Sequence, residues 1–271
     1  GPVAAALFTG NAVVVKCSEQ VVWSSTYFAH LARRALEVEG FDPDVIQLVC
    51  CWPEDADYLT SHPLLKHITF IGSRPVAHAV AEAASRSLTP VVMELGGKDP
   101  LLVLDPLSPQ RLKEISSIVM RGVFQSAGQN CIGVERVIAT PQSYSFLCKS
   151  LGERIPQLRL GASLDELGDV DVGALIAPHH LDRLEHLVED AVASGATLLA
   201  GGRRFVHPKY PLGIYFEPTL LVGVTPSMRI AQEEVFGPIC LLMCAESTND
   251  AVRIANSSQF GLGAAVFGSS S

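Results

Sequence analysis

The chain has 271 residues, of which 48% are apolar, and it carries a formal net charge of −8 with a pI near 5.5. This length allows one large domain or two moderate domains with hydrophobic cores, and the apolar content excludes a disordered chain. The acidic balance and the lack of a Lys/Arg cluster argue against a nucleic-acid-binding surface, so no nucleic acid is expected as a partner.

Short β-rich runs alternate with helical patterns in the first third of the chain. Strands are predicted at 12–16, 45–50, 67–72 and 90–95, and helices at 19–38, 53–61 and 75–87. Strand–helix–strand units at this spacing indicate a parallel sheet with helices on its faces. The near-continuous apolar strands fit burial on both sides.

Beyond Gly96-Gly97 the same alternation continues in longer units. Strands are predicted at 101–104, 133–140, 196–202, 216–224, 238–246 and 261–267, and helices at 108–126, 178–194 and 247–257. Leu112, Ile115, Val119 and Val123 form one apolar stripe on the first of these helices. The predicted fold class is therefore α/β, with two open parallel-sheet domains over 1–95 and 96–271.

The chain has seven cysteines, an odd number, and it is long enough to fold without stabilising disulfide bonds. Both observations favour a reducing compartment and therefore an intracellular, cytoplasmic location. Membrane or organelle targeting by an upstream segment stays open, because the sequence begins at Gly1 without a methionine. Cys-x-x-Cys is absent and His179-His180 has no ligand pattern beside it, so no metal site is expected.

Cys131 differs from the other cysteines in its surroundings. It follows Gly128, Gln129 and Asn130 and precedes the strand-like run GVERVIAT. Small residues at a turn leave room for a substrate beside a thiol, and the thiolate is the form that attacks carbonyls. The residues alone leave two interpretations open, a catalytic nucleophile or a small buried cysteine at a helix–strand junction.

Glu94 ends the run PVVMEL and precedes two glycines. A carboxylate at the carboxyl end of a strand lies where α/β active sites collect, and partial burial would raise its pKa toward that of a general base. The alternative is a strand-end glutamate that faces solvent. Lys98 does not indicate a P-loop, because the required pattern is absent and Asp99-Pro100 follows.

Three further short runs carry less information by themselves. In KCSE (16–19), Ser18 could be a helix N-cap, and in FIGS (70–73), Ser73 could cap a helix or bind pyrophosphate together with backbone N–H groups. EEVFGP (233–238) alone favours a surface acidic pair and a core aromatic residue.

In this order KCSE, FIGS, ELGGK, GQNC and EEVFGP resemble the aldehyde dehydrogenase superfamily over essentially the whole chain. The family is nearly twice as long, so this chain is expected to be an internal fragment without the N-terminal part and the C-terminal segment. The resemblance implies an aldehyde dehydrogenase-like fold, with a partial Rossmann-like cofactor domain at 1–95 and a truncated catalytic domain at 96–271.

The resemblance also implies a role for each matching residue. Cys131 would be the nucleophile and Glu94 the general base. The expected cofactor residues are Lys16 and Glu19 at the adenosine ribose, Gly72 and Ser73 at the pyrophosphate, Glu234 at the nicotinamide-side ribose and Phe236 near the nicotinamide ring. Glu19 would repel a 2′-phosphate and so favours NAD, whereas Lys16 leaves NADP open. Cys17 stands where the family usually has proline.

The implied reaction is NAD(P)-dependent oxidation of an aldehyde to a carboxylic acid through a thiohemiacetal and a thioester on Cys131. Glu94 favours water over coenzyme A as the acyl acceptor. Two alternatives stay open, an inactive truncated or pseudo-enzyme form and an acyl-transferring member of the superfamily. A homo-oligomer is expected for the full-length protein, and the sequence does not specify the aldehyde.

Overall fold

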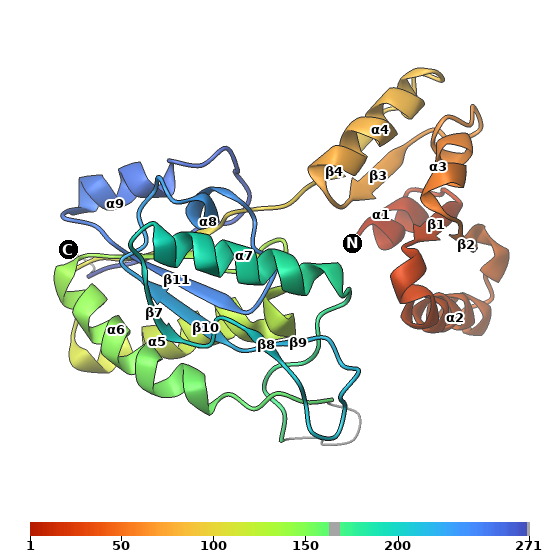
Figure 1. The fold of residues 1–271 in the computed structure, drawn as a ribbon. Helices are drawn as coiled ribbons and strands as arrows, with labels where there is room; N and C mark the ends of the chain where they lie inside the picture. The colour runs from red at the N-terminus through yellow and green to blue at the C-terminus, as the bar shows by residue number, and fades with distance from the viewer. Residues whose placement is uncertain (163–168, 270–271) are drawn as a thin grey trace. The chain divides into compact units, whose positions relative to one another are not determined.

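The computed structural model describes residues 1–162 and 169–269 (Figure 1). The chain divides into two compact units, Gly1–Leu95 and Gly96–Ser271, and the division falls beside the Gly-Gly turn. Among the described residues, none of the helices combines the length and the apolarity that a membrane span would require.

The first unit contains two separate pairs of parallel strands. β1 (Val13–Cys17) pairs with β2 (Ile46–Cys50), and β3 (Ile68–Ile71) pairs with β4 (Val91–Glu94). The helices are α1 (Pro2–Phe8), α2 (Val22–Val38), α3 (Pro53–Thr60) and α4 (Arg74–Ser85), with 3₁₀ turns at Glu19–Val21 and Pro43–Val45. The predicted elements are confirmed, and α1 is an addition that the sequence patterns did not predict.

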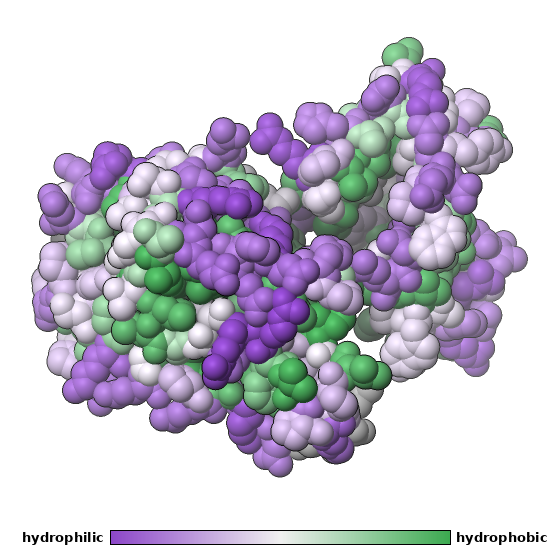
Figure 2. Space-filling model, viewed as in Figure 1, coloured by the Kyte–Doolittle hydropathy of each residue, from purple (hydrophilic) through white to green (hydrophobic). Residues whose placement is uncertain are grey.

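Burial of these strands on both faces, as predicted, is wrong. β3 and β4 alternate half-buried with exposed residues, and α2 buries none of its residues. Apolar side chains reach the surface of this unit (Figure 2), and those of Phe8, Phe28 and Val92 are more than half exposed. The physical reason is that a two-stranded pair offers too little area for helices to cover on both sides.

The second unit is built on one six-stranded sheet in the order β12-β5-β6-β11-β10-β7. Its strands are β5 (Pro100–Val103), β6 (Arg136–Ala139), β7 (Thr197–Ala200), β10 (Thr219–Val222), β11 (Ile239–Cys244) and β12 (Ala265–Phe267). The neighbours pair in parallel except β7, which runs antiparallel to β10. A two-stranded ribbon joins β8 (Arg204–Phe205) to β9 (Tyr215–Phe216).

Helices cover both faces of this sheet (Figure 1). They are α5 (Pro109–Phe124), α6 (Pro141–Arg154), α7 (His179–Ala193), α8 (Arg229–Gln232) and α9 (Thr248–Ala255), with 3₁₀ turns at Gln125–Gly128 and Ile155–Gln157. The right-handed crossover from β5 to β6 places α5 on one face, where it packs against α6. The crossovers that contain α8 and α9 run the opposite way along the sheet and place these helices on the other face. The predicted stripe on α5 is confirmed, because all four of its residues are buried in the core.

The helix α6 was not predicted, and its N-terminus is capped from a distant part of the chain. Asp105 accepts hydrogen bonds from the backbone N–H groups of Gln142 and Ser143, both at 3.0 Å, and from the Ser143 hydroxyl at 2.5 Å. Burial alone would raise the pKa of Asp105, but these bonds and that of Thr140 together hold it below its ordinary value. The predicted α/β class is therefore confirmed, and α6, α8 and the β8–β9 ribbon are additions that the sequence patterns did not predict.

Candidate functional site

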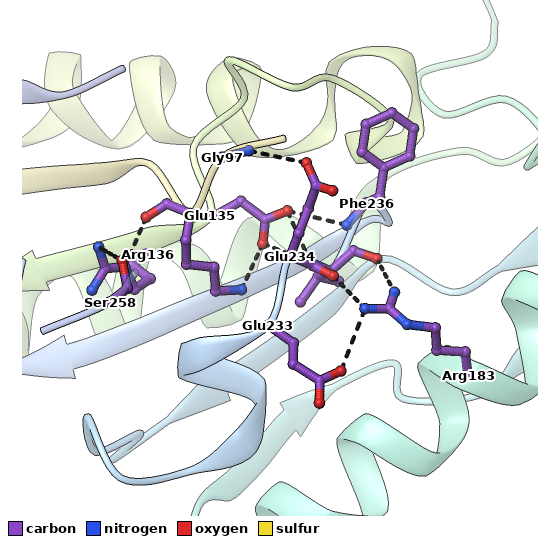
Figure 3. A network of polar contacts seen from close by, with 10 residues as sticks. Gly97, Glu135, Arg136, Arg183, Glu233, Glu234, Phe236 and Ser258 are labelled. Atoms are coloured by element: carbon purple, nitrogen blue, oxygen red, sulfur yellow. Dashed lines mark hydrogen bonds and ion pairs between the residues drawn. The ribbon is translucent and has the colours of Figure 1, made fainter. Parts of the chain in front are cut away.

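Three of the short motifs lie directly before neighbouring parallel strands of the second unit. Gly96–Lys98 precede β5, the GQNC turn precedes β6, and residues 233–238 precede β11. Because β5, β6 and β11 are adjacent and parallel, the loops before them meet at one edge of the sheet. The contact is direct, since the Gly97 N–H donates to Glu234 Oε1 at 3.1 Å (Figure 3).

The turn that carries Cys131 has an unusual backbone. Ser126, Ala127 and Gly128 follow one another with φ values of 57°, 56° and 71°, all in the left-handed region. The side chain of Gln129 ties the turn to the segment before α7, because its Oε1 accepts from Ile176 N at 2.9 Å. The Cys131 side chain is half-buried at the end of this turn, so it differs from a fully enclosed structural cysteine.

Cys240 shows the contrasting environment within the same unit. Its thiol is fully buried in β11, and this burial raises its pKa to about 12. A thiol with such a pKa is protonated at neutral pH and does not act as a nucleophile.

Two glycines allow the three loops to touch through their backbones. A Cβ on Gly128 would overlap the Gly237 carbonyl, and a Cβ on Gly97 would lie 2.7 Å from the carbonyl oxygen of Cys131. Larger residues at either position would push the loops apart. The small residues around Cys131 therefore form close loop–loop contacts as well as a turn.

Glu234 is half-buried and its carboxylate is turned toward Gly97 (Figure 3). Burial is the main reason that its pKa is raised, and the charge of Glu135 adds to the effect, while the Gly97 N–H opposes it. Phe236, two residues later, has a left-handed backbone with φ 54°. The EEVFGP loop therefore has a specific backbone conformation and contacts other motifs. This argues against the interpretation of its two glutamates as a plain acidic pair on the surface.

The sequence patterns do not reveal a buried network of charged side chains behind these loops. Lys98 Nζ lies 2.7 Å from Glu135 Oε2, and the side chains are 0% and 7% exposed. Burial lowers the pKa of Lys98, and the Glu135 carboxylate opposes this shift. Arg183 from α7 donates to the carbonyls of Glu234 and, at 3.0 Å, of Val235 (Figure 3). The available signal was the pair Glu135-Arg136 at the start of an otherwise apolar strand.

Lys16 and Glu19 lie in the first unit, at and just after the carboxyl end of β1. Their charged groups are 3.8 Å apart, and both side chains are about 30% exposed. Glu19 lines a cavity of about 340 Å³ together with Val22, Cys50, Cys51, Trp52 and Asp55, at the carboxyl ends of β1 and β2. Ser18 caps the 3₁₀ turn by accepting from Gln20 N at 3.3 Å, which confirms the N-cap interpretation of KCSE.

Gly72, Ser73 and Glu94 lie at the carboxyl ends of the other strand pair. Gly72 N donates to Glu94 O at 3.1 Å. Ser73 is the N-cap residue of α4, but its side chain makes no capping hydrogen bond. The Glu94 side chain is exposed, so the expected partial burial is wrong, because only β3 flanks β4 within this unit.

Comparison with known proteins assigns the chain to a family. The profile of the aldehyde dehydrogenase family matches residues 1–271. The chain belongs to the aldehyde dehydrogenase family. An aldehyde dehydrogenase-like protein of Saccharomyces cerevisiae is 58% identical, over 99% of this chain and 42% of its own length. The vanillin dehydrogenase of Pseudomonas fluorescens is 33% identical, over 98% of this chain and 52% of its own length.

Solved structures of the family share the fold. A betaine aldehyde dehydrogenase of Staphylococcus aureus in complex with NAD+ superposes with a TM-score of 0.89 at 29% identity, over 98% of this chain and 52% of its own. The lactaldehyde dehydrogenase of Escherichia coli gives 0.86 at 30% identity, with 98% and 54% coverage. The predicted family and aldehyde dehydrogenase-like fold are confirmed, and the chain spans about half the length of the relatives it matches.

Proposed function

We propose that this family member takes part in the NAD(P)-dependent oxidation of an aldehyde to a carboxylic acid, with Cys131 as the nucleophile. The observation that carries this proposal is the convergence of three loops at one sheet edge. Cys131, Gly97 and Glu234 lie within direct backbone or hydrogen-bond contact of one another's loops. These are the segments to which the family resemblance assigns the nucleophile and the nicotinamide-side contacts.

Cys131 carries the covalent steps. Its thiolate attacks the aldehyde carbonyl and forms a C–S bond, and the carbonyl oxygen becomes an oxyanion that the Cys131 backbone N–H can stabilise. Bound NAD would supply the hydride acceptor, and Cys131 would then carry the acyl group as a thioester. Water then attacks the thioester carbonyl, and the C–S bond breaks to release the acid and the thiolate.

Glu94 is assigned the role of general base for that water. A carboxylate at the carboxyl end of β4 with an exposed side chain is accessible to water and can accept a proton. A glutamate here favours hydrolysis over transfer to coenzyme A, as the family resemblance implies.

The first unit offers the groups that a dinucleotide needs. Glu19 provides acceptors for ribose hydroxyls beside a cavity at the strand ends, where nucleotides bind in open α/β sheets. The Ser73 hydroxyl makes no capping bond, so it and the N-terminus of α4 can serve a pyrophosphate. We infer NAD as the preferred cofactor because Glu19 would repel a 2′-phosphate, although a related succinate-semialdehyde dehydrogenase of Mycobacterium leprae is named for NADP(+).

An inactive form is the second candidate, because the chain spans about half the length of its relatives. Activity should therefore be measured on the 271-residue chain and on a polypeptide of full family length that contains it. The assay follows NADH after mixing with NAD and simple aldehydes. If only the long polypeptide forms NADH, the 271-residue chain is the inactive form. If neither forms NADH, the proposed reaction is rejected for these aldehydes.

Two substitutions test the assigned roles in the active polypeptide. Cys131→Ser should abolish the burst of NADH, while Cys148→Ser, at another half-buried thiol, serves as the matched control and should preserve it. Glu94→Gln should keep the burst and slow the steady-state turnover. A normal burst in Cys131→Ser would refute the nucleophile, and wild-type turnover in Glu94→Gln would refute the base.

A further inference from the structure

Glu135 is a buried carboxylate that none of the five recognised motifs includes. Its side chain is 7% exposed at the start of β6, and its Oε2 lies 2.7 Å from Lys98 Nζ. It also accepts backbone hydrogen bonds from Val235 N, at 3.0 and 3.1 Å to its two oxygens, and from Phe236 N at 3.1 Å. One side chain therefore satisfies donors from the loops before β5 and before β11 (Figure 3).

The loop at 233–238 is shaped to receive this carboxylate. Successive N–H groups converge on an anion when a residue adopts the left-handed conformation, and Phe236 does so with φ 54°. Non-glycine residues in this region carry a conformational cost and persist only where the surroundings hold them. The hydrogen bonds from Val235 and Phe236 to Glu135 are such a restraint.

The same carboxylate is connected to Glu234 by a second route. Lys98, its ion-pair partner, directly follows Gly97, whose N–H donates to Glu234 Oε1 at 3.1 Å. Arg136, next to Glu135, donates to the Lys98 carbonyl at 2.9 Å and so fixes the lysine from its backbone side. Glu234 is thus held through its side chain by Gly97, and its neighbour Val235 is held by Glu135.

Stability alone is a weak explanation for this ion pair. Removing two charges from water is unfavourable, and apolar residues of similar volume often replace a buried ion pair without loss of stability. Apolar residues cannot, however, accept the N–H groups of Val235 and Phe236. The property that requires an oxygen at position 135 is therefore the conformation of the loop.

We propose that Glu135 is a positioning residue that fixes Glu234 and Phe236 for the nicotinamide end of the cofactor. This inference rests on the proposed function, because the roles of Glu234 and Phe236 come from it. Glu135 acts through the loop backbone and is not assigned any contact with substrate or cofactor.

The test compares two double variants that both remove the buried charges. Lys98→Met with Glu135→Gln keeps an acceptor oxygen for the loop, whereas Lys98→Met with Glu135→Leu removes it. We expect the Gln pair to keep the KM for NAD within about twofold of wild type and the Leu pair to raise it about tenfold or more, with the KM for aldehyde nearly unchanged in both. Equal KM values for NAD in the two pairs would overturn the proposal.

Amide hydrogen exchange provides a readout that does not depend on activity. The amides of Val235 and Phe236 should be protected in the wild-type chain and in the Gln pair, and unprotected in the Leu pair. A wild type that forms no NADH but protects these amides would reject the proposed reaction and keep the loop restraint. Unprotected amides in the wild-type chain would overturn the positioning role without any variant, even if the Leu pair fails to fold.

Discussion

Substitution of Gly128 by alanine tests the contact between the Cys131 turn and the loop before β11. Gly128 has φ 71°, and its Cβ would overlap the Gly237 carbonyl and lie 3.0 Å from Pro238 N. These are backbone atoms of a loop that Glu135 and Arg183 hold in place, so they cannot move aside easily. Gly223→Ala is the matched control, because Gly223 has φ 68° with no atom within 4 Å of the added Cβ.

The two variants share the left-handed backbone and differ in the space around the new methyl group. The left-handed conformation costs alanine about 1–2 kcal/mol, which is the whole expected effect of Gly223→Ala. Overpacking against a fixed neighbour adds about 1–3 kcal/mol, so Gly128→Ala should lower the free energy of unfolding by about 2–5 kcal/mol. Only the second effect depends on the convergence of the loops.

Urea unfolding followed by circular dichroism measures both free energies. The rate of alkylation of Cys131 by iodoacetamide, read by peptide mass, reports the turn directly and should change in Gly128→Ala only. Equal destabilisation of the two variants, with unchanged alkylation of Cys131, would refute the close approach of Gly128 to Gly237.

Three further predictions follow from the contacts described above. Asp105→Ala should lower the free energy of unfolding by about 1–2 kcal/mol at pH 7 through loss of the α6 cap, and the difference should shrink at pH 3. The difference shrinks because the pKa of Asp105 is lower in the folded state than in the unfolded state. The stabilisation by Asp105 is complete above the unfolded-state pKa of about 3.9 and disappears as the pH falls through the lower folded-state pKa. The KM for NAD should rise on acidification toward pH 5, because the raised pKa of Glu234 makes this carboxylate lose its charge at a higher pH than an ordinary glutamate. Glu234→Gln should flatten the pH dependence of this KM, and an unchanged pH dependence in the variant would contradict the prediction. Ser73→Ala should lower the free energy of unfolding by less than about 0.5 kcal/mol but raise the KM for NAD severalfold. Ser108→Ala, which removes the cap of α5, should lower the free energy of unfolding by about 1 kcal/mol and leave the KM for NAD unchanged. The reverse result would make Ser73 a plain N-cap.

Most helices and strands could be predicted because they depend on local sequence patterns. The apolar stripe on α5 and the strand–helix alternation are properties of neighbouring residues, and the structure confirms them. The helix α6 was missed because its polar sequence carries a weak pattern, and its N-terminus is capped by Asp105, 37 residues before Gln142. Such a contact is invisible until the chain has folded.

The candidate site was predicted only as far as the order of its motifs. That the loops before β5, β6 and β11 meet depends on β11 pairing with β6, and chain order does not specify this neighbour. The pairing of Glu135 with Val235 spans 100 residues and joins a strand predicted as ordinary to a recognised motif. The exposure of Glu94 was also unpredictable, because the run PVVMEL does not reveal how many strands flank it.

The left-handed run of Ser126, Ala127 and Gly128 has a consequence for molecules that react with Cys131. Two of these residues are not glycine, and non-glycine residues persist in this region only where the surrounding structure holds them. A turn that the fold already holds in place should lose little conformational entropy when a reactive group binds beside it. Covalent inhibitors of this thiol should therefore differ in potency according to their own flexibility, with rigid electrophiles ahead of flexible ones of equal reactivity.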